Sequence, residues 1–261
     1  MKKLLRTVQV YFPGLLEAKF SLMRMYRNTL KRPFENDFRA LSLFPDMDGA
    51  LFLDVGANRG QSADAILMAQ NNARIQLFEP NELLSAKLKR LFRSNPGVVV
   101  NNFGLGSENT ESTLYIPFYR KWMFDGLASF DQRAAMDWLR DRIFFYRDTL
   151  LTVHKSACRV RKLDDLKLAP FLIKLDVQGY EFRALKGGEE TIKAHEPILL
   201  IESPDSDVMH FLTGLHYEFY CYEHGKFVRG TIGKLNTFFM TEKKSQLVEN
   251  YIEHGQGRVS V

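Results

Sequence analysis

An acidic residue and two glycines follow the first apolar run of the chain. Residues 51–62 read LFLDVGANRGQS, so Asp54 comes at the end of the run and Gly56 and Gly60 lie just beyond it. Glycine lets the backbone turn tightly and approach a ligand closely. A carboxylate at this point attracts a cationic ligand and repels a pyrophosphate. We therefore predict a ligand-binding loop, in preference to a turn that only connects a strand to a helix.

The loop lacks both common phosphate-binding fingerprints. A dinucleotide fingerprint needs glycine where Asn58 and Gln61 stand, and a P-loop needs a lysine that the GQS of 60–62 does not contain. S-adenosylmethionine has an ammonium group, a sulfonium group and no phosphate, so its charge matches an acidic loop. The residues expected to hold this cofactor belong to the loop and the start of the next helix: Asp54, Gly56, Ala57, Asn58, Gly60 and Gln61.

Polar residues also end the second and third apolar runs. Glu79 ends IQLFE, and its carboxylate can accept hydrogen bonds from two neighbouring ribose hydroxyls. Asn102 follows VVVN and could meet the edge of the adenine, although an asparagine before a glycine turn is also a common structural feature. We expect both residues to bind the cofactor.

Methyl transfer to a hydroxyl needs an aligned acceptor and a base that takes its proton. Asp176 after LIKL is our first choice of base, with Glu202 after ILLI and Glu181 on the intervening turn as further carboxylates. The alternatives are that Asp176 holds its own turn or the methionine end of the cofactor, and that Glu202 only positions other groups. His154 is the rival base, because histidine titrates near neutral pH, unless it is an exposed loop residue.

Strand-like and helix-like segments alternate after residue 45, which predicts an α/β fold with a mostly parallel sheet and helices on both faces. Two late apolar segments, 217–222 and 237–241, are expected to form an antiparallel C-terminal hairpin at the sheet edge. The expected parallel strands are the apolar runs at 51–55, 75–78, 98–100, 171–175 and 198–201.

Six segments between residues 51 and 202 resemble the FkbM-type S-adenosylmethionine-dependent methyltransferases in order and spacing. They are FLDVGANRGQ, LFEP, NNFGLGS, RKLDDL, LIKLDVQGYEFRALKGG and PILLIE. The resemblance implies a seven-stranded, Rossmann-like class I methyltransferase fold and O-methylation, often of a sugar hydroxyl in a glycan or glycosylated metabolite. Gln178 departs from the pattern, because many members have glutamate there, and any role of that carboxylate is absent from this chain.

We divide the chain into a basic helical segment (1–48), a methyltransferase domain (49–245) and a C-terminal tail (246–261). The domain contains an aromatic-rich insertion at about 115–156, where long connections often carry function. Its aromatic residues are expected either to stack on a sugar or to build a small core: Tyr119, Trp122, Phe124 and Trp138. Its basic residues are expected to hold anionic groups: Arg120, Lys121, Arg140 and Arg142.

The N-terminal segment is strongly basic. Residues 2–32 contain eight Lys or Arg and one acid, Glu17, with apolar residues at helical spacing: Leu16, Phe20, Met23, Tyr26 and Leu30. This pattern predicts an amphipathic helix. It could pack on the domain or on a second subunit of a homodimer, or it could contact a membrane surface or a lipid-linked substrate.

Composition and motifs limit the classes of protein to which the chain could belong. No apolar run approaches the roughly 20 residues that cross a bilayer, and the two cysteines, Cys158 and Cys221, are expected to be reduced core residues of a cytoplasmic, or membrane-peripheral, protein. No Cys/His cluster predicts a metal site. The chain also lacks an NPPY-like motif and an RNA-binding module, so we expect no nucleic-acid partner. The alternative to an enzyme is an inactive cofactor-binding scaffold recruited by the basic helix.

Overall fold

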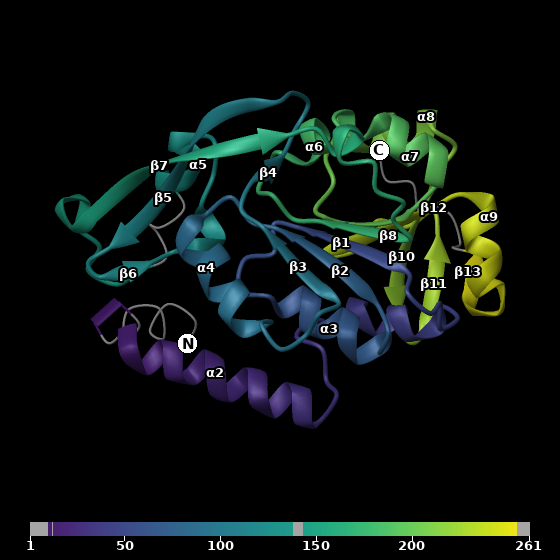
Figure 1. The fold of residues 1–261 in the computed structure, drawn as a ribbon, viewed down its shortest axis with the longest axis horizontal. Helices are drawn as coiled ribbons and strands as arrows, with labels where there is room; N and C mark the ends of the chain where they lie inside the picture. The colour runs from purple at the N-terminus through teal and green to yellow at the C-terminus, as the bar shows by residue number, and fades with distance from the viewer. Residues whose placement is uncertain (1–9, 12, 138–142, 255–261) are drawn as a thin grey trace.

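The computed structural model describes residues 10–11, 13–137 and 143–254, and it contains two sheets (Figure 1). The larger sheet has the strand order β13-β11-β10-β12-β9-β8-β1-β2-β3. Its strands are β1 (Leu51–Val55), β2 (Arg74–Phe78), β3 (Val98–Asn101), β8 (Leu172–Leu175), β9 (Ile198–Glu202), β10 (Glu218–Glu223), β11 (Lys226–Arg229), β12 (Asn236–Met240) and β13 (Ile252–His254).

Five neighbouring strands, from β3 to β9, are parallel. The chain moves outward from β1 through β2 to β3 on one side and from β8 to β9 on the other, so the strand order reverses between β1 and β8. In such sheets the ligand lies beyond the carboxyl ends of the strands at this reversal. The expected α/β architecture is confirmed, with the site of interest at the tips of β1, β2 and β8.

The sheet has two strands more than the expected seven, and both are in its C-terminal part. β10 and β12 are antiparallel, as predicted, but the segment between them forms β11, which pairs with the opposite side of β10. β12 also pairs with β9 and therefore lies inside the sheet, not at its edge. β13, from the expected C-terminal tail, pairs with β11. All five residues of β12 are buried, which explains why a strand of this composition takes an interior position.

The smaller sheet has the order β4-β7-β5-β6 and contains most of the expected insertion. Its strands are β4 (Gly104–Leu105), β5 (Thr110–Tyr119), β6 (Trp122–Met123) and β7 (Leu151–Arg161), with η2 (Asp125–Leu127), α5 (Gln132–Asp137) and η3 (Asp148–Leu150) between the last strands. β5 and β7 are paired along ten residues of each strand, which makes this region a rigid β-ribbon instead of a loop.

The aromatic residues that we expected to contact a sugar are largely buried where the structure describes them. Tyr119, Trp122 and Phe124 are buried in one small cluster, so for these three the small-core alternative describes their position. Trp138, Arg140 and Arg142 lie outside the described residues.

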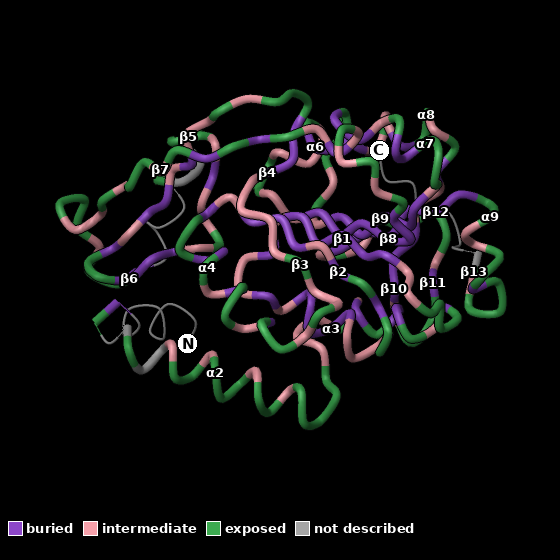
Figure 2. Tube along the Cα trace, viewed as in Figure 1, coloured by how far each residue is buried: buried purple, intermediate pink, exposed green. Residues whose placement is uncertain are grey.

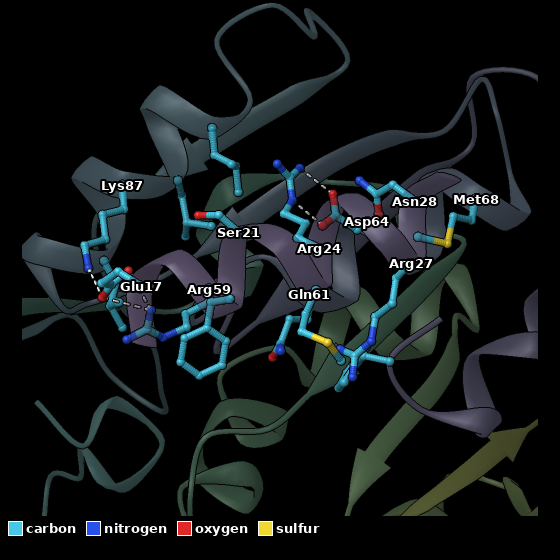
Figure 3. A pocket seen from close by; sticks show the side chains of 16 residues that line it. Glu17, Ser21, Arg24, Arg27, Asn28, Arg59, Gln61, Asp64, Met68 and Lys87 are labelled. Carbon is cyan, nitrogen blue, oxygen red and sulfur yellow. Dashed lines mark hydrogen bonds and ion pairs between the residues drawn. The ribbon is translucent and has the colours of Figure 1, made fainter. Parts of the chain in front are cut away.

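The N-terminal basic segment forms a helix, α2 (Pro13–Thr29), that lies alongside α3 (Gln61–Ala69) and α4 (Glu82–Leu91) (Figure 1). Phe20 stacks on Trp122 with 6.4 Å between ring centroids. Arg24 reaches Asp64 of α3 with two hydrogen bonds (Figure 3). The tube coloured by burial shows that most of α2 is nevertheless exposed (Figure 2).

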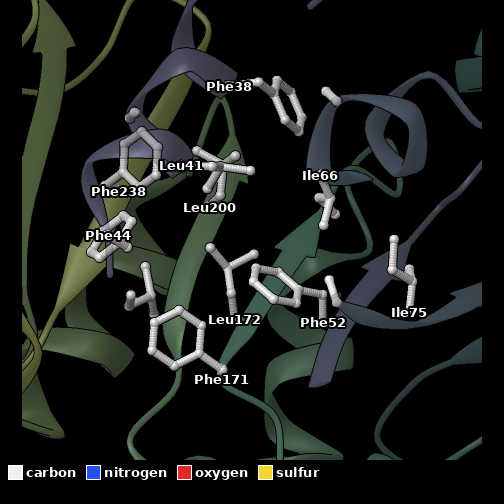
Figure 4. Packing of buried hydrophobic residues seen from close by; sticks show 14 of the residues in the cluster. Phe38, Leu41, Phe44, Phe52, Ile66, Ile75, Phe171, Leu172, Leu200 and Phe238 are labelled. Atoms are coloured by element: carbon white, nitrogen blue, oxygen red, sulfur yellow. The ribbon is translucent and has the colours of Figure 1, made fainter. Parts of the chain in front are cut away.

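Helices cover both faces of the large sheet. On one face α3, α4 and the 3-10 helix η1 (Asn36–Leu43) enclose an apolar cluster in which Phe38 and Ile66 pack over Phe52 and Leu172 (Figure 4). On the other face α6 (Glu181–Lys186), α7 (Glu189–His195) and α8 (Ser206–Gly214) enclose a second cluster. The remaining helices are η4 (Leu163–Leu166), α9 (Glu242–Ser245) and η5 (Gln246–Tyr251).

None of the helices in the described parts of the chain is long and apolar enough to cross a membrane. Both cysteines are buried and free, which agrees with the expectation of reduced core residues.

Candidate active site

A pocket lies at the tips of β1, β2 and β8, where the strand order reverses, and the small sheet forms its other wall. The strand tips contribute Gly56, Asn58, Glu79, Pro80, Asp176, Val177 and Gln178. The small sheet and the segment after β6 contribute Leu114, Asp125, Gly126, Ala128 and Phe130. Four of the predicted site residues, Gly56, Asn58, Glu79 and Asp176, are therefore brought together in one place.

The two glycines of the first loop are required by the fold itself. Both have positive φ, +81° for Gly56 and +80° for Gly60. A Cβ on Gly56 would lie 1.9 Å from the carbonyl oxygen of Asp176, and one on Gly60 would lie 2.9 Å from the side chains of Leu88 and Phe92. The loop after β1 is thus pressed against the loop after β8, and this contact shapes one end of the pocket.

Glu79 is a buried carboxylate on the pocket wall. Only 6% of the residue is exposed, and its two oxygens accept hydrogen bonds from the backbone N–H groups of Asn58 (2.8 Å) and Asn81 (2.9 Å). Burial raises the pKa of Glu79 to about 7 despite these two bonds. Each carboxylate oxygen keeps a lone pair for a further donor, so the group can accept two ligand hydroxyls when it is ionised.

Asp54 faces the interior and not the pocket wall. It is fully buried, and neither side-chain oxygen has a hydrogen-bond partner among the described residues. Its counter-ion is Lys174 of β8, whose Nζ lies 3.5 Å from Asp54 Oδ1. Burial raises the pKa of Asp54, and Lys174 opposes this shift. The acid of the glycine loop is therefore paired with Lys174 and is not among the residues that line the pocket.

Lys174 is the residue that sequence reasoning missed. It stands in the middle of the apolar segment LIKL and is 4% exposed. Besides Asp54, its ammonium lies 3.4 Å from the carbonyl oxygen of Gly56 and 3.3 Å from Asp176 Oδ2. Burial lowers its pKa, but the two aspartates outweigh burial and the net shift is upward. A lone lysine within a buried strand was the available signal, because such a charge must be paired.

Asp176 and Glu202 form a carboxyl pair at the tips of β8 and β9. Burial opposes ionisation of Asp176, but Lys174, a hydrogen bond with Glu202 and one from Gln178 Nε2 (2.9 Å) outweigh it and lower the pKa of Asp176. Burial and the hydrogen bond with Asp176 raise the pKa of Glu202 to about 8. The two shifts run in opposite directions, so the pair favours ionisation at Asp176 and retention of a proton at Glu202.

Gln178 explains its own departure from the family pattern. Its amide donates to the Asp176 carboxylate, whereas a glutamate at the same position would add another negative charge beside that of Asp176. Glu181 accepts a hydrogen bond from the N–H of Val177 at 2.9 Å and so fixes the turn that carries Gln178. Its carboxylate is thus engaged with its own turn.

The other predicted site residues lie elsewhere. Asn102 donates from its side-chain amide to the carbonyl oxygens of Glu79 and Pro80 (3.0 and 3.3 Å), so this nitrogen holds the loop after β2. Gln61 lines a groove beneath α2, and Ala57 is buried in the core. His154 is exposed within β7, with its ring 4.4 Å from that of Phe118, and it is not among the residues that line the pocket at the strand tips.

Arg59 connects the glycine loop to the pocket wall and to α2. It forms ion pairs with Asp125, which lines the pocket, and with Glu17 of α2 at 3.1 Å. Its guanidinium also lies over the rings of Phe20 (4.4 Å) and Trp122 (5.4 Å). Nothing in the sequence points to this hub, because its partners come from two distant segments, α2 and residues 122–125.

No group of three or more His, Cys, Asp or Glu residues within the described residues could hold a metal ion. The described pocket brings together carboxylates and backbone groups, with the buried Lys174 beside Asp176. An α/β domain with this strand order and an acidic pocket at the strand reversal is the architecture of a class I methyltransferase.

The family model described as "Methyltransferase FkbM domain" matches residues 54–219, which is more than half of the chain. The protein belongs to the FkbM methyltransferase family. Its methyl donor is S-adenosylmethionine. The carboxylates of the pocket fit this cofactor. Glu79 can accept hydrogen bonds from two ribose hydroxyls, and the acidic residues at the strand tips attract an ammonium and a sulfonium group.

A curated relative is the AMB antimetabolite synthetase AmbE of Pseudomonas aeruginosa. It is 31% identical over 180 residues, an alignment that covers 60% of this chain and 8% of the synthetase. This chain therefore matches only a small part of that much longer protein.

Solved structures resemble the chain weakly. An FkbM methyltransferase from Methylobacillus flagellatus is 18% identical with a TM-score of 0.47, covering 74% of this chain and 44% of that one. An rRNA methylase from Streptococcus thermophilus is 11% identical with a TM-score of 0.42, covering 80% and 95%. An O-methyltransferase from Thermotoga maritima is 13% identical with a TM-score of 0.37, covering 80% and 65%. These similarities are too weak to transfer a substrate or a mechanism.

Proposed function

We propose that the protein transfers a methyl group to a hydroxyl oxygen of a sugar or another small polyhydroxy acceptor. The observation that carries this proposal is the Asp176–Glu202 pair, which keeps an ionised carboxylate on the pocket wall beside a protonated one. S-adenosylmethionine supplies the electrophilic methyl group when it is bound. An acceptor hydroxyl that donates a hydrogen bond to Asp176 has its oxygen oriented and its proton directed to a base.

Before the transfer, the protonated Glu202 stabilises the negative charge on Asp176. Asp176 then takes the acceptor's proton while the bond from the acceptor oxygen to the methyl carbon forms and the methyl–sulfur bond breaks, which would leave S-adenosylhomocysteine. Lys174 holds Asp176 in place, because its Nζ lies 3.3 Å from Asp176 Oδ2. After transfer the pair carries two protons and no charge, and loss of one proton to water restores it. No metal ion is needed for this sequence of proton movements.

A saccharide acceptor is supported by the composition of the pocket wall. Asp125 and Asp176 present carboxylates that can accept from hydroxyl groups, and Phe130 presents an aromatic surface close to them, its ring 4.6 Å from that of Tyr180. Carboxylates combined with an aromatic ring match the polar edge and the apolar face of a pyranose. Phe130 therefore takes the sugar-stacking role that we expected of Tyr119, Trp122 and Phe124, because these three residues are buried in the small core.

The test is formation of S-adenosylhomocysteine by the purified protein with a library of sugar acceptors. With a positive acceptor, Asp176→Asn should lower the single-turnover rate by about 100-fold or more at saturating cofactor, because it keeps the shape and removes the basicity. His154→Gln is the matched control and should leave the rate within twofold or so of wild type. The reverse result would move the base to β7.

Calorimetry of cofactor binding separates the two remaining outcomes. If Asp176→Asn weakens cofactor binding in parallel with activity, Asp176 holds the cofactor or the turn and is not the base. If the wild-type protein binds S-adenosylmethionine and methylates nothing in the library, the result favours the alternative of an inactive cofactor-binding scaffold.

A further inference from the structure

The helix α2 turns its ionic residues toward the protein. Arg24 donates from Nε and Nη2 to the carboxylate of Asp64 at 2.5 and 2.6 Å (Figure 3). Glu17 accepts from Lys87 at 2.9 Å and pairs with Arg59. The inner face of the helix is therefore held mainly by charge pairs, with Phe20 as its main aromatic contact.

Large apolar side chains occupy the opposite face of α2. Leu22, Met25 and Tyr26, at positions i, i+3 and i+4, are 60%, 62% and 55% exposed. Leu30, just beyond the helix end, is also exposed. A surface helix normally buries its apolar side and exposes its charges. A contiguous apolar patch on the outside is instead the mark of an interaction surface.

The expected apolar stripe is thus divided between the two faces. Phe20 packs against Trp122, whereas Tyr26 and Leu30 point to solvent. Packing of the whole stripe on the domain is therefore not what the structure shows. The reason is that Arg24 and Glu17 find partners on α3, α4 and the glycine loop, and these pairs set the rotation of the helix.

Charge selects the partner of this face. Residues 2–32 contain eight Lys or Arg and a single acid, and that acid, Glu17, is already paired. Lys19, Lys31 and Arg32 are exposed on or just after the helix. A second copy of the same face would bring like charges together, whereas an anionic lipid surface would neutralise them.

We propose that α2 is a membrane-docking helix that lies in the headgroup region of an anionic bilayer, with Leu22, Met25 and Tyr26 inserted and the basic residues at the lipid phosphates. This surface is separate from the methyl-transfer pocket. Glu17 and Asp125 share Arg59, so the helix is held in a fixed relation to the pocket wall.

Co-sedimentation with vesicles tests the proposal without any assay of activity. Wild-type protein should bind vesicles of phosphatidylcholine that contain about 30% phosphatidylglycerol, and should bind far less to phosphatidylcholine alone or at high salt. The combined variant Leu22→Gln, Met25→Gln and Tyr26→Gln should reduce binding about tenfold or more, because glutamine keeps helix propensity and removes the apolar surface.

A matched control variant replaces three apolar residues that are exposed elsewhere on the protein: Val99→Gln, Ile232→Gln and Leu247→Gln. It should bind the anionic vesicles like wild type. Circular dichroism and thermal melts should show that both variants keep the fold. Equal binding by the α2 variant and wild type would overturn the proposal, as would a wild-type protein that does not bind anionic vesicles at all.

Two further measurements test the electrostatic part of the proposal and the alternative that this face is a dimer interface. Lys19→Glu with Arg32→Glu should weaken binding to the anionic vesicles, and unchanged binding would contradict the electrostatic part of the proposal. Sedimentation velocity in the absence of lipid should give the same mass for wild type and the Leu22/Met25/Tyr26 variant. A wild-type dimer that this variant dissociates would make the face a subunit interface and overturn the membrane assignment.

Discussion

Glu79 and Asp176 are carboxylates on opposite sides of one pocket, at the tips of two parallel strands, and they have opposite shifts in pKa. Glu79 is held by two backbone N–H groups without a cation, and burial raises its pKa to about 7. Asp176 is opposed by burial as well, but Lys174, Glu202 and Gln178 lower its pKa. The residue type and the strand position are similar, and the surroundings decide the protonation state.

In the proposed function, this difference gives the two sides separate tasks. Asp176 remains a charged acceptor for a hydroxyl proton across the neutral range, whereas Glu79 becomes a full acceptor for two ligand hydroxyls only when it loses its own proton. Lys174 is the main cause, because this buried ammonium lies beside Asp54 and Asp176. Changing Lys174, Glu79 and Glu202 in turn tests each part of this comparison.

Lys174→Met should have the largest effect. It keeps much of the side-chain volume and removes the cation from two buried aspartates, so we expect the free energy of unfolding to fall by about 3–5 kcal/mol. Urea denaturation at pH 7 measures this loss. Lys226→Met is the control, because its ion pair with Glu253 is exposed and should contribute at most about 1 kcal/mol. Similar losses in the two variants would mean that Lys174 is not the charge that organises the strand tips.

Glu79→Gln should have the second-largest effect, which is a loss of affinity for the cofactor. The amide replaces one acceptor oxygen by a donor, so we expect a loss of roughly 1.5–3 kcal/mol in S-adenosylmethionine binding by calorimetry at pH 8. In the wild type the dissociation constant should rise roughly tenfold from pH 8 to pH 6, because the ionised fraction of a group with a pKa of about 7 falls by that factor.

Glu79→Gln should abolish this pH dependence as well as weaken binding. A wild-type affinity that does not change between pH 6 and pH 8, or a variant that retains the pH dependence, would show that Glu79 does not accept the ligand hydroxyls in its ionised form.

Glu202→Gln should have the smallest effect, on the pH dependence of stability. The pKa of Glu202 is raised from 4.5 to about 8 in the folded protein, so the folded state binds more protons than the unfolded state between these values. Stability therefore falls as pH rises through this window. Between pH 7 and 8 Glu202 should account for a decrease of up to about 1 kcal/mol after allowance for solvent screening, and Glu79, which is about half ionised at pH 7, adds a smaller decrease of the same sign.

The amide of Glu202→Gln resembles the protonated acid, so the variant should lose less stability than wild type between pH 7 and 8 in urea denaturation. Glu190→Gln is the control, because that side chain is 79% exposed. Parallel curves for wild type and the Glu202 variant would mean that the proton is not held by this pair.

Local patterns were enough to predict the α/β class, the family and the acids at the strand tips. Apolar runs of four or five residues that end in Asp54, Glu79 and Asp176 place these residues at one edge of a parallel sheet, whatever the details of packing. The alternation of strands and helices likewise depends on periodicity within each segment. Such inferences need no knowledge of which distant segments meet.

Contacts between distant segments were decided only in three dimensions. Lys174 lies 118 residues from Gly56, and it meets the carbonyl of Gly56 because β1 and β8 are neighbours in the sheet. The same applies to the interior position of β12 and to the ion pair of Arg59 with Asp125. The rotation of α2 is a further case: the sequence shows an amphipathic helix, but ion pairs with α3, α4 and the glycine loop determine which of its faces remains exposed. Burial and pairing energies depend on partners that only the folded chain brings within a few ångströms.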